Sequence, residues 1–206
     1  TFLCSKNILT KQQITDASEE FKEEINEHLQ IAFDEETIKV DLTSELKDVY
    51  KEYQQEIIVP SNQKSNIRLI DAISKGLRES MERYDNLIIM GQDVAEYGGV
   101  FKITEGFANK FGRERVRNTP ICESAIVSAA YGASLNGMKA VMEMQFADFV
   151  SSGFNPIVNL LAKSNYRWNQ NADVVVRMPC GAGVGAGPFH SQTNEAWFTK
   201  TPGLKV

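Results

Sequence analysis

The chain has 206 residues, of which 42% are hydrophobic, and this is enough for one or two domains with their own cores. No apolar run approaches the ~20 residues of a membrane span, and no basic stripe with interleaved aromatic residues suggests nucleic-acid binding. Residues 1–60 carry six lysines and 14 acidic residues, a net charge of −8, whereas the remaining 16 basic and 13 acidic residues give +3, so the total is −5.

Three widely spaced cysteines, Cys4, Cys122 and Cys180, argue against a disulfide framework or a zinc site and favour a reducing compartment. No basic segment followed by an apolar run marks a signal peptide, so we expect a cytoplasmic protein that does not bind membranes. The chain starts without Met and stops at PGLKV, where we expect an apolar strand to begin. We therefore expect a piece of a longer polypeptide.

Residues 1–59 are expected to be helical. Thr10 and Gln13 form a capping-box pattern, after which one apolar stripe follows at helical spacing: Ile14, Ala17, Phe21, Ile25, Leu29 and Ala32. A second helix is expected from Asp41 or Thr43, with its own stripe: Leu42, Leu46, Val49, Tyr50 and Tyr53. Such helices bury little by themselves, so we expect this segment to lie against another domain or wrap a partner. The polar residues 60–66 are expected to form a linker.

From residue 67 onward, helical and strand patterns alternate. Strands are expected at 87–91, 139–145 and 173–179, and helices at 67–83, 105–111, 123–136, 148–165 and 192–199. This alternation predicts an α/β fold with a parallel sheet covered by helices on both faces. Ligands of such sheets bind beyond the carboxyl ends of the strands, so we expect the following loops to share one rim: 92–104, 118–123, 145–149 and 179–191.

Glu123 is the only charged residue between Arg117 and Lys139, and it stands at the head of a helix of small and apolar residues that is expected to be buried. The helix dipole favours the ionised carboxylate, whereas burial favours the protonated acid. A group between these two influences is suited to share a proton with a ligand. The alternative is a capping carboxylate that serves only its own helix.

Two further segments carry candidate residues. In QFADF, Gln145 can hydrogen-bond the edge of a ligand while Phe146 and Phe149 offer flat apolar surfaces; the alternative is a pair of core aromatics at a strand–helix turn. His190 follows the glycine-rich stretch CGAGVGAGPF, whose glycines are expected to build a compact loop that positions it. A purely structural histidine is the alternative.

Two other patterns carry little weight. GAGVGA at 181–186 matches a dinucleotide fingerprint, but Pro188 follows at once and no acidic residue stands about 20 positions later, so we do not expect a dinucleotide site. The segment GQDVAEYGGVFKITEGF at 91–107 contains Asp93, Glu96 and a glycine pair, and by itself it is typical of a surface loop.

The order of these motifs resembles a known family. GQDVAEYGGVFKITEGF, RVRNTPICESAIVSAAYGAS, EMQFADF, VVVRMP, HSQ and PGLKV follow one another over residues 67–206 as they do in the β part of thiamine-diphosphate-dependent 2-oxo acid dehydrogenases, the E1 component. Residues 1–59 are similar to the helical tail of the α part of these enzymes. The resemblance implies a middle piece of a fused α–β E1, with 67–206 as its pyrimidine-binding domain, truncated near its end.

The resemblance also implies roles for individual residues. Glu123 is implied to hydrogen-bond N1′ of the cofactor's aminopyrimidine, and so to favour the tautomer that activates the thiazolium ring. Gln145 and Phe149 are implied to line the pyrimidine pocket, with a backbone contact from Ile121. His190 is implied to act in substrate binding or in acyl transfer to lipoyl-lysine. The backbone of Ala172, Val174 and Val175 corresponds to a region that binds potassium in some relatives.

The other half of the implied active site is absent from this sequence. The family holds the diphosphate and its Mg²⁺ with a GDG…N motif in the α part, and no such motif occurs here. The fragment alone is therefore expected to be inactive. The implied partners are a 2-oxo acid, with branched-chain acids favoured by QFADF and RMP…HSQ, and the lipoyl domain of an E2 acyltransferase. A homodimer of the fused chain is implied as well.

Two alternative functions remain open from the sequence. A transketolase-type enzyme would share the glutamate and the fold, although the amphipathic tail and HSQ speak against it. A non-catalytic interaction module would use 1–59 as a docking arm and 67–206 as a scaffold.

Overall fold

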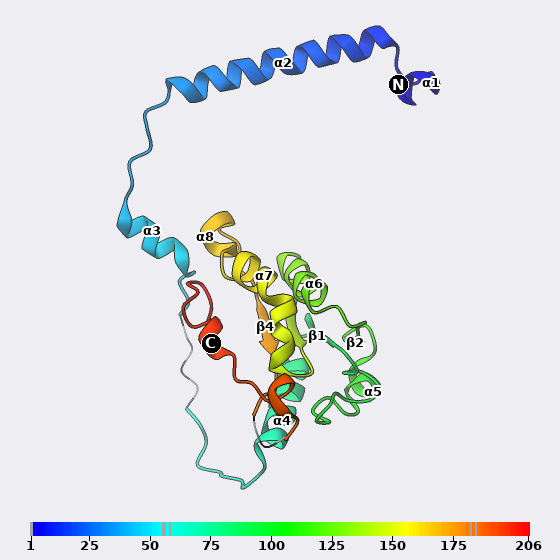
Figure 1. Cartoon of the computed structure of the whole chain (residues 1–206), viewed down its shortest axis with the longest axis vertical. Helices are drawn as coiled ribbons and strands as arrows, with labels where there is room; N and C mark the ends of the chain where they lie inside the picture. The colour runs from blue at the N-terminus through cyan, green and yellow to red at the C-terminus, as the bar shows by residue number, and fades with distance from the viewer. Residues whose placement is uncertain (1, 55–56, 58, 182, 184) are drawn as a thin grey trace. The chain divides into compact units, whose positions relative to one another are not determined.

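A computed structural model describes residues 2–54, 57, 59–181, 183 and 185–206, shown in Figure 1. The chain divides into two compact units, Thr1–Asp41 and Leu42–Val206. The predicted division into 1–59, a 60–66 linker and 67–206 remains a prediction. In the second unit, the helix α3 (Leu42–Val49) already belongs to the larger body.

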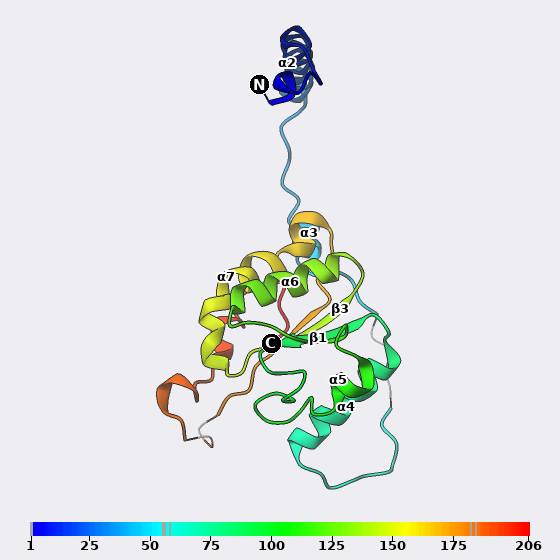
Figure 2. The same cartoon turned by 90° about the vertical axis from the view of Figure 1, so that its right-hand side faces the viewer.

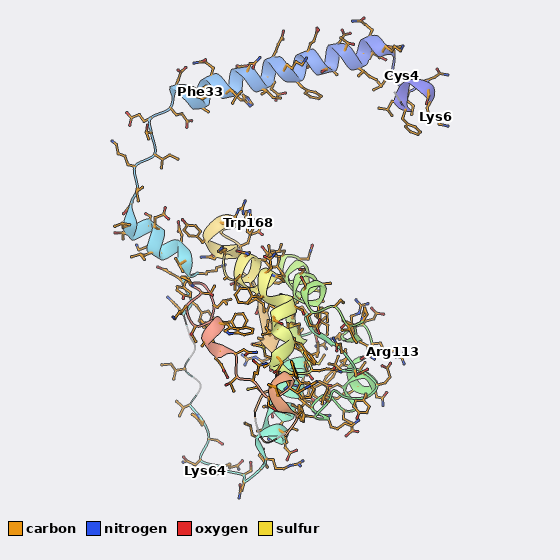
Figure 3. All side chains as sticks on the ribbon, in the orientation of Figure 1. Cys4, Lys6, Phe33, Lys64, Arg113 and Trp168 are labelled. Carbon is orange, nitrogen blue, oxygen red and sulfur yellow. The ribbon has the colours of Figure 1, made fainter. Side chains whose placement is uncertain are left out.

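The first unit contains α1 (Phe2–Ser5) and α2 (Lys11–Asp34). The predicted capping box at the start of α2 is confirmed, because the Thr10 side chain accepts from the backbone N–H of Gln13 and the Gln13 side chain accepts from the Thr10 N–H. None of the residues of α2 is buried, and its side chains project on every side (Figure 3). Among the described residues, no helix has the length and apolar character to cross a membrane.

In the second unit, α3 packs against α8 (Ser164–Trp168). The Tyr166 hydroxyl donates to Glu45 at 2.6 Å, and the Asn165 amide donates to the Asp48 carbonyl at 2.8 Å. The Glu45 carboxylate raises the pKa of Tyr166, so this phenol stays a donor. The helix ends at Val49 and leaves out the predicted positions Tyr50 and Tyr53.

The second unit is built on a four-stranded parallel sheet in the order β2-β1-β3-β4. The register pairs Ile89 with Val116 across β1 and β2, and Ile88 with Ala140 across β1 and β3. Glu143 of β3 lies beside Arg177 of β4. The strands run β1 (Leu87–Gly91), β2 (Val116–Asn118), β3 (Lys139–Glu143) and β4 (Val174–Arg177).

Helices cover both faces of this sheet, as the sequence predicted (Figure 2). One core packs α6 (Glu123–Leu135) and η2 (Ile157–Leu161) onto the face formed by Ile88, Met90, Ala140 and Met142. The other core packs α4 (Leu69–Arg83) and α5 (Phe107–Phe111) onto the opposite face formed by Leu87, Ile89 and Val141. The alternation follows from the two-residue period of a strand.

Several predicted elements need correction. The helix expected at 148–165 is broken into η1 (Ala147–Gly153), α7 (Phe154–Pro156), the π-helical η2 and α8, because Gly153 and Pro156 interrupt it. The helix expected at 192–199 is only the short η5 (Glu195–Trp197), which follows η4 (Gly187–Phe189). The strand β2 was not predicted. The expectation that α6 is buried all round is also wrong, because Leu135 is 43% exposed and only one side of the helix faces the core.

Candidate functional site

The parallel direction of the strands brings four loops to the carboxyl edge of the sheet. Contacts between these loops confirm the predicted rim. The loop after β1 contacts Glu123 and Gln145, and the loop after β3 contacts His190. The rim therefore joins segments that lie up to about 100 positions apart in the sequence.

Glu123 is the first residue of α6 and is half-buried. Its Oε1 accepts a hydrogen bond from Nε2 of Gln92 at 3.4 Å, and Gln92 is only 6% exposed. Within the part of the chain that the structure describes, no lysine or arginine forms an ion pair with Glu123. The carboxylate thus has a neutral donor at one oxygen, and the N-terminal end of α6 behind it favours negative charge.

Gln145 lies two residues beyond β3 and is half-buried. Its Nε2 donates to Oδ2 of Asp93 at 3.2 Å. Asp93 has φ +57°, a left-handed backbone conformation that non-glycine residues rarely adopt but that Asp tolerates better than most. The loop after β1 therefore contacts both predicted polar residues of the rim.

His190 lies in a cluster of aromatic rings. Its imidazole makes edge-to-face contacts with Phe146 and Phe149, with ring centroids 4.9 and 5.4 Å apart. Phe101, from the loop after β1, meets Phe146 in the same geometry at 6.1 Å. The structure thus brings Phe149 and His190, both predicted site residues, into direct contact, and each ring remains partly accessible.

Polar contacts hold the segment around His190 against the start of η1. The backbone N–H of Gln192 donates to Oδ1 of Asp148 at 3.3 Å, and the Asn194 amide donates to the Ala147 carbonyl at 3.0 Å. The predicted glycine loop at 181–186 falls partly outside the described residues, because Ala182 and Val184 are not among them.

Asn118, the last residue of β2, connects two of the loops. Its Oδ1 accepts from the backbone N–H of Ala95 at 2.8 Å, and its Nδ2 donates to Glu96 at 2.5 Å. Glu96 is in turn 2.6 Å from Arg113. These bonds fix the loop after β1 beside the Thr-Pro segment that leads to Glu123.

A buried ion pair underlies the rim. Glu143, at the end of β3, is 3% exposed and accepts from the guanidinium of Arg177 at the end of β4. Gly99 passes directly over this carboxylate, because a Cβ atom there would lie 3.0 Å from its Oε1. The pair neutralises both charges below the rim, so Arg177 does not act as a free cation beside Glu123.

Most of the buried polar atoms that lack a hydrogen-bond partner in the described chain lie in segments of the rim. Among the described residues, four buried side-chain atoms have no partner, and three of them belong to rim segments: Thr119 Oγ1, Asp148 Oδ2 and Ser191 Oγ. Buried polar atoms are nearly always paired in folded proteins. The partly accessible aromatic rings and the amide–carboxylate pair of the same rim offer flat apolar surface and polar edges, which suit a heteroaromatic ligand.

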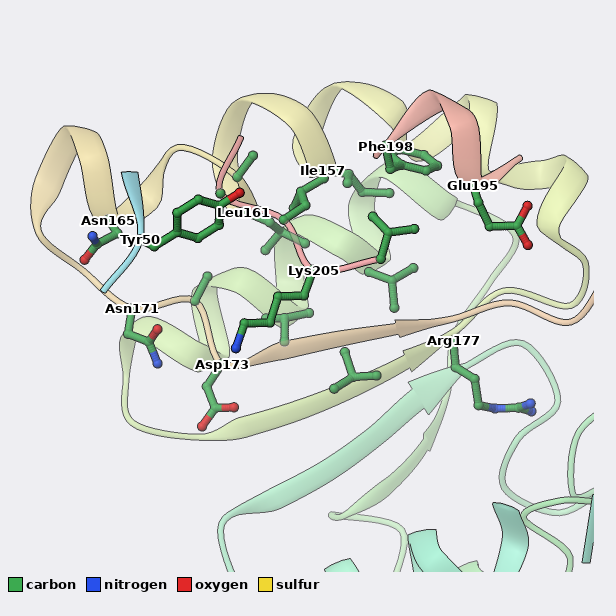
Figure 4. Close-up of a pocket in the computed structure, with 18 of the residues that line it drawn as sticks. Tyr50, Ile157, Leu161, Asn165, Asn171, Asp173, Arg177, Glu195, Phe198 and Lys205 are labelled. Carbon is green, nitrogen blue, oxygen red and sulfur yellow. The ribbon is translucent and has the colours of Figure 1, made fainter. Parts of the chain in front are cut away.

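Ile121, predicted for a backbone contact, lies in the rim loop just before α6 with its side chain 82% exposed, whereas the predicted potassium segment lies elsewhere. Ala172, Val174 and Val175 lie at the opposite, amino-terminal end of β4, where they line a cavity of about 840 Å³ together with Leu161, Phe198 and Leu204 (Figure 4). That cavity contains none of Glu123, Gln145, Phe149 or His190. We place the candidate site at the rim, because the polar contacts and the orphaned atoms are found there.

Sequence reasoning missed Gln92 and gave Asp93 little weight. Both follow a strand directly, which is a recognisable signal in a parallel sheet. Their partners could not be inferred, because the hydrogen bonds cross 31 and 52 positions of sequence.

The fold and the rim define an α/β domain whose ligand-binding edge lies at the carboxyl ends of parallel strands. Residues 65–206 match the family model described as "Transketolase, pyrimidine binding domain", and the chain belongs to this family.

Curated relatives agree with this assignment. The chain is 46% identical over 139 residues to the 2-oxoisovalerate dehydrogenase subunit beta of Bacillus subtilis (strain 168), which covers 66% of this chain and 42% of the relative. It is 39% identical over 144 residues to the subunit of the same name from Pseudomonas aeruginosa, covering 69% of this chain and 41% of the relative. It is 38% identical over 142 residues to the pyruvate dehydrogenase E1 component subunit beta of Acholeplasma laidlawii, covering 68% of this chain and 43% of the relative. The chain thus spans less than half the length of these relatives.

Proposed function

We propose that this chain forms the pyrimidine-binding part of the E1 component of a 2-oxo acid dehydrogenase, which oxidatively decarboxylates a 2-oxo acid on thiamine diphosphate. The observation that carries the proposal is the half-buried Glu123 at the start of α6, hydrogen-bonded to a neutral amide and to no cation of the described chain. The names of the relatives support the reaction class.

In this proposal the rim holds the aminopyrimidine. Glu123 shares a proton with N1′, because a carboxylate without a cationic partner can alternate between accepting and donating there. Phe149 and Gln145 line the ring, and the backbone of Ile121 lies beside it. When bound, thiamine diphosphate supplies the carbanion chemistry, while the protein orients it and tunes its protonation.

Other parts of the holoenzyme complete the site. We propose that the diphosphate and Mg²⁺ are held by an α part, fused to this chain through residues 1–59, and that the fused chain forms a homodimer. The backbone of Ala172, Val174 and Val175 is proposed to bind K⁺. A location in the cytoplasm also stays a proposal, since relatives include proteins whose printed names say mitochondrial.

The acyl product is proposed to leave on the lipoyl domain of an E2 acyltransferase, with His190 contributing to substrate binding or to this transfer. Its contacts with Phe146 and Phe149 support a fixed imidazole near the ring-binding surface. Branched-chain substrates are favoured, because the 46% identical relative is named for 2-oxoisovalerate.

The test replaces Glu123 with Gln in the full-length enzyme. Loss of the proton-sharing group is expected to lower decarboxylation of branched-chain 2-oxo acids at least about 100-fold. Turnover is measured with an artificial electron acceptor, so that E2 is not required.

Glu114→Gln is the matched control, since this carboxylate is 91% exposed and pairs with Arg117 at the surface. It is expected to leave turnover unchanged. Near-normal turnover of the Glu123 variant rejects the proposal. Wild-type activity toward sugar phosphates, with none toward 2-oxo acids, would instead support a transketolase-type enzyme.

A further inference from the structure

The two residues that follow β1 make contacts in different directions. Gln92 is buried and reaches toward α6, where its Nε2 lies 3.4 Å from Oε1 of Glu123. Asp93 is exposed and reaches toward the loop after β3, where its Oδ2 lies 3.2 Å from Nε2 of Gln145. One dipeptide therefore contacts both polar residues of the proposed site.

The chemistry of these pairs fixes their orientation. An ionised carboxylate only accepts hydrogen bonds, whereas a primary amide has one accepting and one donating end. Gln92 must therefore turn its nitrogen toward Glu123, and Gln145 must turn its nitrogen toward Asp93. As a result, Oε2 of Glu123 and Oε1 of Gln145 are the atoms that these two contacts leave for a ligand.

The backbone at Asp93 is part of this arrangement. Its left-handed conformation, φ +57°, turns the chain sharply just after β1. Such a conformation costs free energy at a non-glycine residue and persists only where the surroundings compensate for it. Here the Gly99 N–H donates to the Asp93 carbonyl at 2.8 Å, so a backbone hydrogen bond closes the turn.

We propose that Gln92 and Asp93 are positioning residues that orient Glu123 and Gln145 for the ligand. By this assignment, Gln145 presents its carbonyl oxygen and selects a ligand edge that carries a hydrogen-bond donor, while Glu123 keeps one oxygen free for proton sharing. The ligand role rests on the proposed function above, since it takes thiamine diphosphate as the probe.

The proposed role of Asp93 is tested with Asp93→Asn and Asp93→Gly. Both residues accept the left-handed backbone, so the turn is retained while the carboxylate is lost. We expect thiamine diphosphate to bind full-length Asp93→Gly about tenfold more weakly, measured by calorimetry, because no side-chain acceptor then orients Gln145. Asp93→Asn is expected to weaken binding less, because its amide oxygen can still accept from Gln145 although the charge is lost.

Lys102→Gly is the matched control. Lys102 is also a left-handed residue in the same loop, with φ +59°, but its side chain donates to the Tyr97 carbonyl and lies over the Tyr97 ring. This variant is expected to bind the cofactor as the wild type does. Weakened binding in it to the same extent would show that loop shape, rather than the Asp93 carboxylate, is responsible.

The role of Gln92 is tested with Gln92→Met, which keeps the length of the side chain and removes its hydrogen-bond donor. Thr104→Val serves as its control, because Thr104 is fully buried in the same loop and its hydroxyl donates to the Val94 carbonyl. We expect Gln92→Met to lower kcat about tenfold with a smaller change in KM. Thr104→Val is expected to lower the stability of the protein without lowering kcat more than it changes KM.

Double-mutant cycles separate positioning from a structural role. If Asp93 acts through Gln145, then Asp93→Gly has no further effect on cofactor affinity in a Gln145→Ala background. In the ligand-free protein, the side-chain amide resonances of Gln145 should shift in Asp93→Gly and stay in place in Lys102→Gly.

The outcomes distinguish the two proposals. A wild-type enzyme that does not bind thiamine diphosphate overturns the proposed function and the ligand role of these residues together. Wild-type binding with unchanged affinity in both Asp93 variants overturns the positioning role alone. Tighter binding in Asp93→Gly also overturns it, because Asp93 would then compete with the ligand for the Gln145 nitrogen.

Discussion

At the scale of single residues, Phe146 connects the rim. Its ring contacts Phe101, Phe149 and His190, all in edge-to-face geometry. Aromatic pairs of this kind contribute about 0.5–1.5 kcal/mol each beyond their buried area. The position of the His190 imidazole therefore depends on a neighbour that makes no hydrogen bond to it.

Replacing Phe146 with Leu is expected to lower the free energy of unfolding by about 1–2 kcal/mol and to shift the imidazole resonances of His190. Chemical denaturation and NMR of the imidazole protons measure the two effects. Phe154→Leu is the control, because Phe154 contacts Trp197 and Phe198 instead. Unmoved His190 resonances in the Phe146 variant would contradict the role given to this cluster.

At the scale of elements, two glycines have opposite surroundings. A Cβ atom at Gly91, the last residue of β1, would lie 2.6 Å from the Glu143 carbonyl and 3.1 Å from a methyl group of Val94. A Cβ atom at Gly132, inside α6, would meet nothing within 4 Å. Close approach of β1 to β3 thus requires glycine at the first site, and nothing requires it at the second.

We expect Gly91→Ala to destabilise the protein by about 1–3 kcal/mol, because the strands must separate where the rim begins. Gly132→Ala is expected to stabilise it by about 0.5–1 kcal/mol, since alanine loses less backbone entropy in a helix. Urea unfolding of both variants measures the difference. Equal effects would mean that the spacing of β1 and β3 at Gly91 is not tightly constrained.

At the scale of the whole molecule, an ion pair ties the amino ends of two strands. Lys139 begins β3 and pairs with Asp173, just before β4. The hydrogen bond with Asp173 raises the pKa of Lys139 above 10.5, although partial burial acts in the opposite direction. Because the folded-state value exceeds the unfolded one, the stabilisation is complete below pH 10.5 and is lost as pH rises through the folded-state value.

Lys139→Met is therefore expected to lower the free energy of unfolding at about pH 8, and this difference from the wild type is expected to shrink as pH rises through the folded-state pKa of Lys139. Solvent exposure of both partners limits the effect to about 1 kcal/mol or less. Arg68→Met is the control, because its hydrogen bond with Asp71 raises the pKa of Arg68 and the guanidinium stays charged throughout. If the difference in unfolding free energy between Lys139→Met and the wild type did not change with pH, the stabilising role given to the Lys139–Asp173 pair would be contradicted.

Much of the architecture could be predicted because its signals are local. The apolar run LIIMG predicted β1 with its observed bounds, and the switch between helical and strand patterns predicted a parallel sheet with two covered faces. β2 was missed because only Val116 of its three residues is buried. The broken helix after β3 was missed because Gly153 and Pro156 were outweighed by the apolar residues around them.

The site was predictable only in part. Glu123 stands out because its neighbours are uncharged, and Gln145 and Phe149 because they follow a strand. The partner of each depends on which strands lie side by side, and that order is a property of the whole sheet. Gln92 and Asp93 therefore became visible only in three dimensions.

The direction of β4 has a bearing on the proposed cation. Ala172 lies five positions before Arg177 and Val175 lies two positions before it; a strand advances about 3.3 Å per residue, so K⁺ on this backbone would sit roughly 7–17 Å below the rim. An ion at that distance, on the far side of packed strands, would not contact the substrate. Any effect of K⁺ would therefore act through the alignment of β4 with β3. The ion would stabilise the sheet and would not contact the reacting atoms.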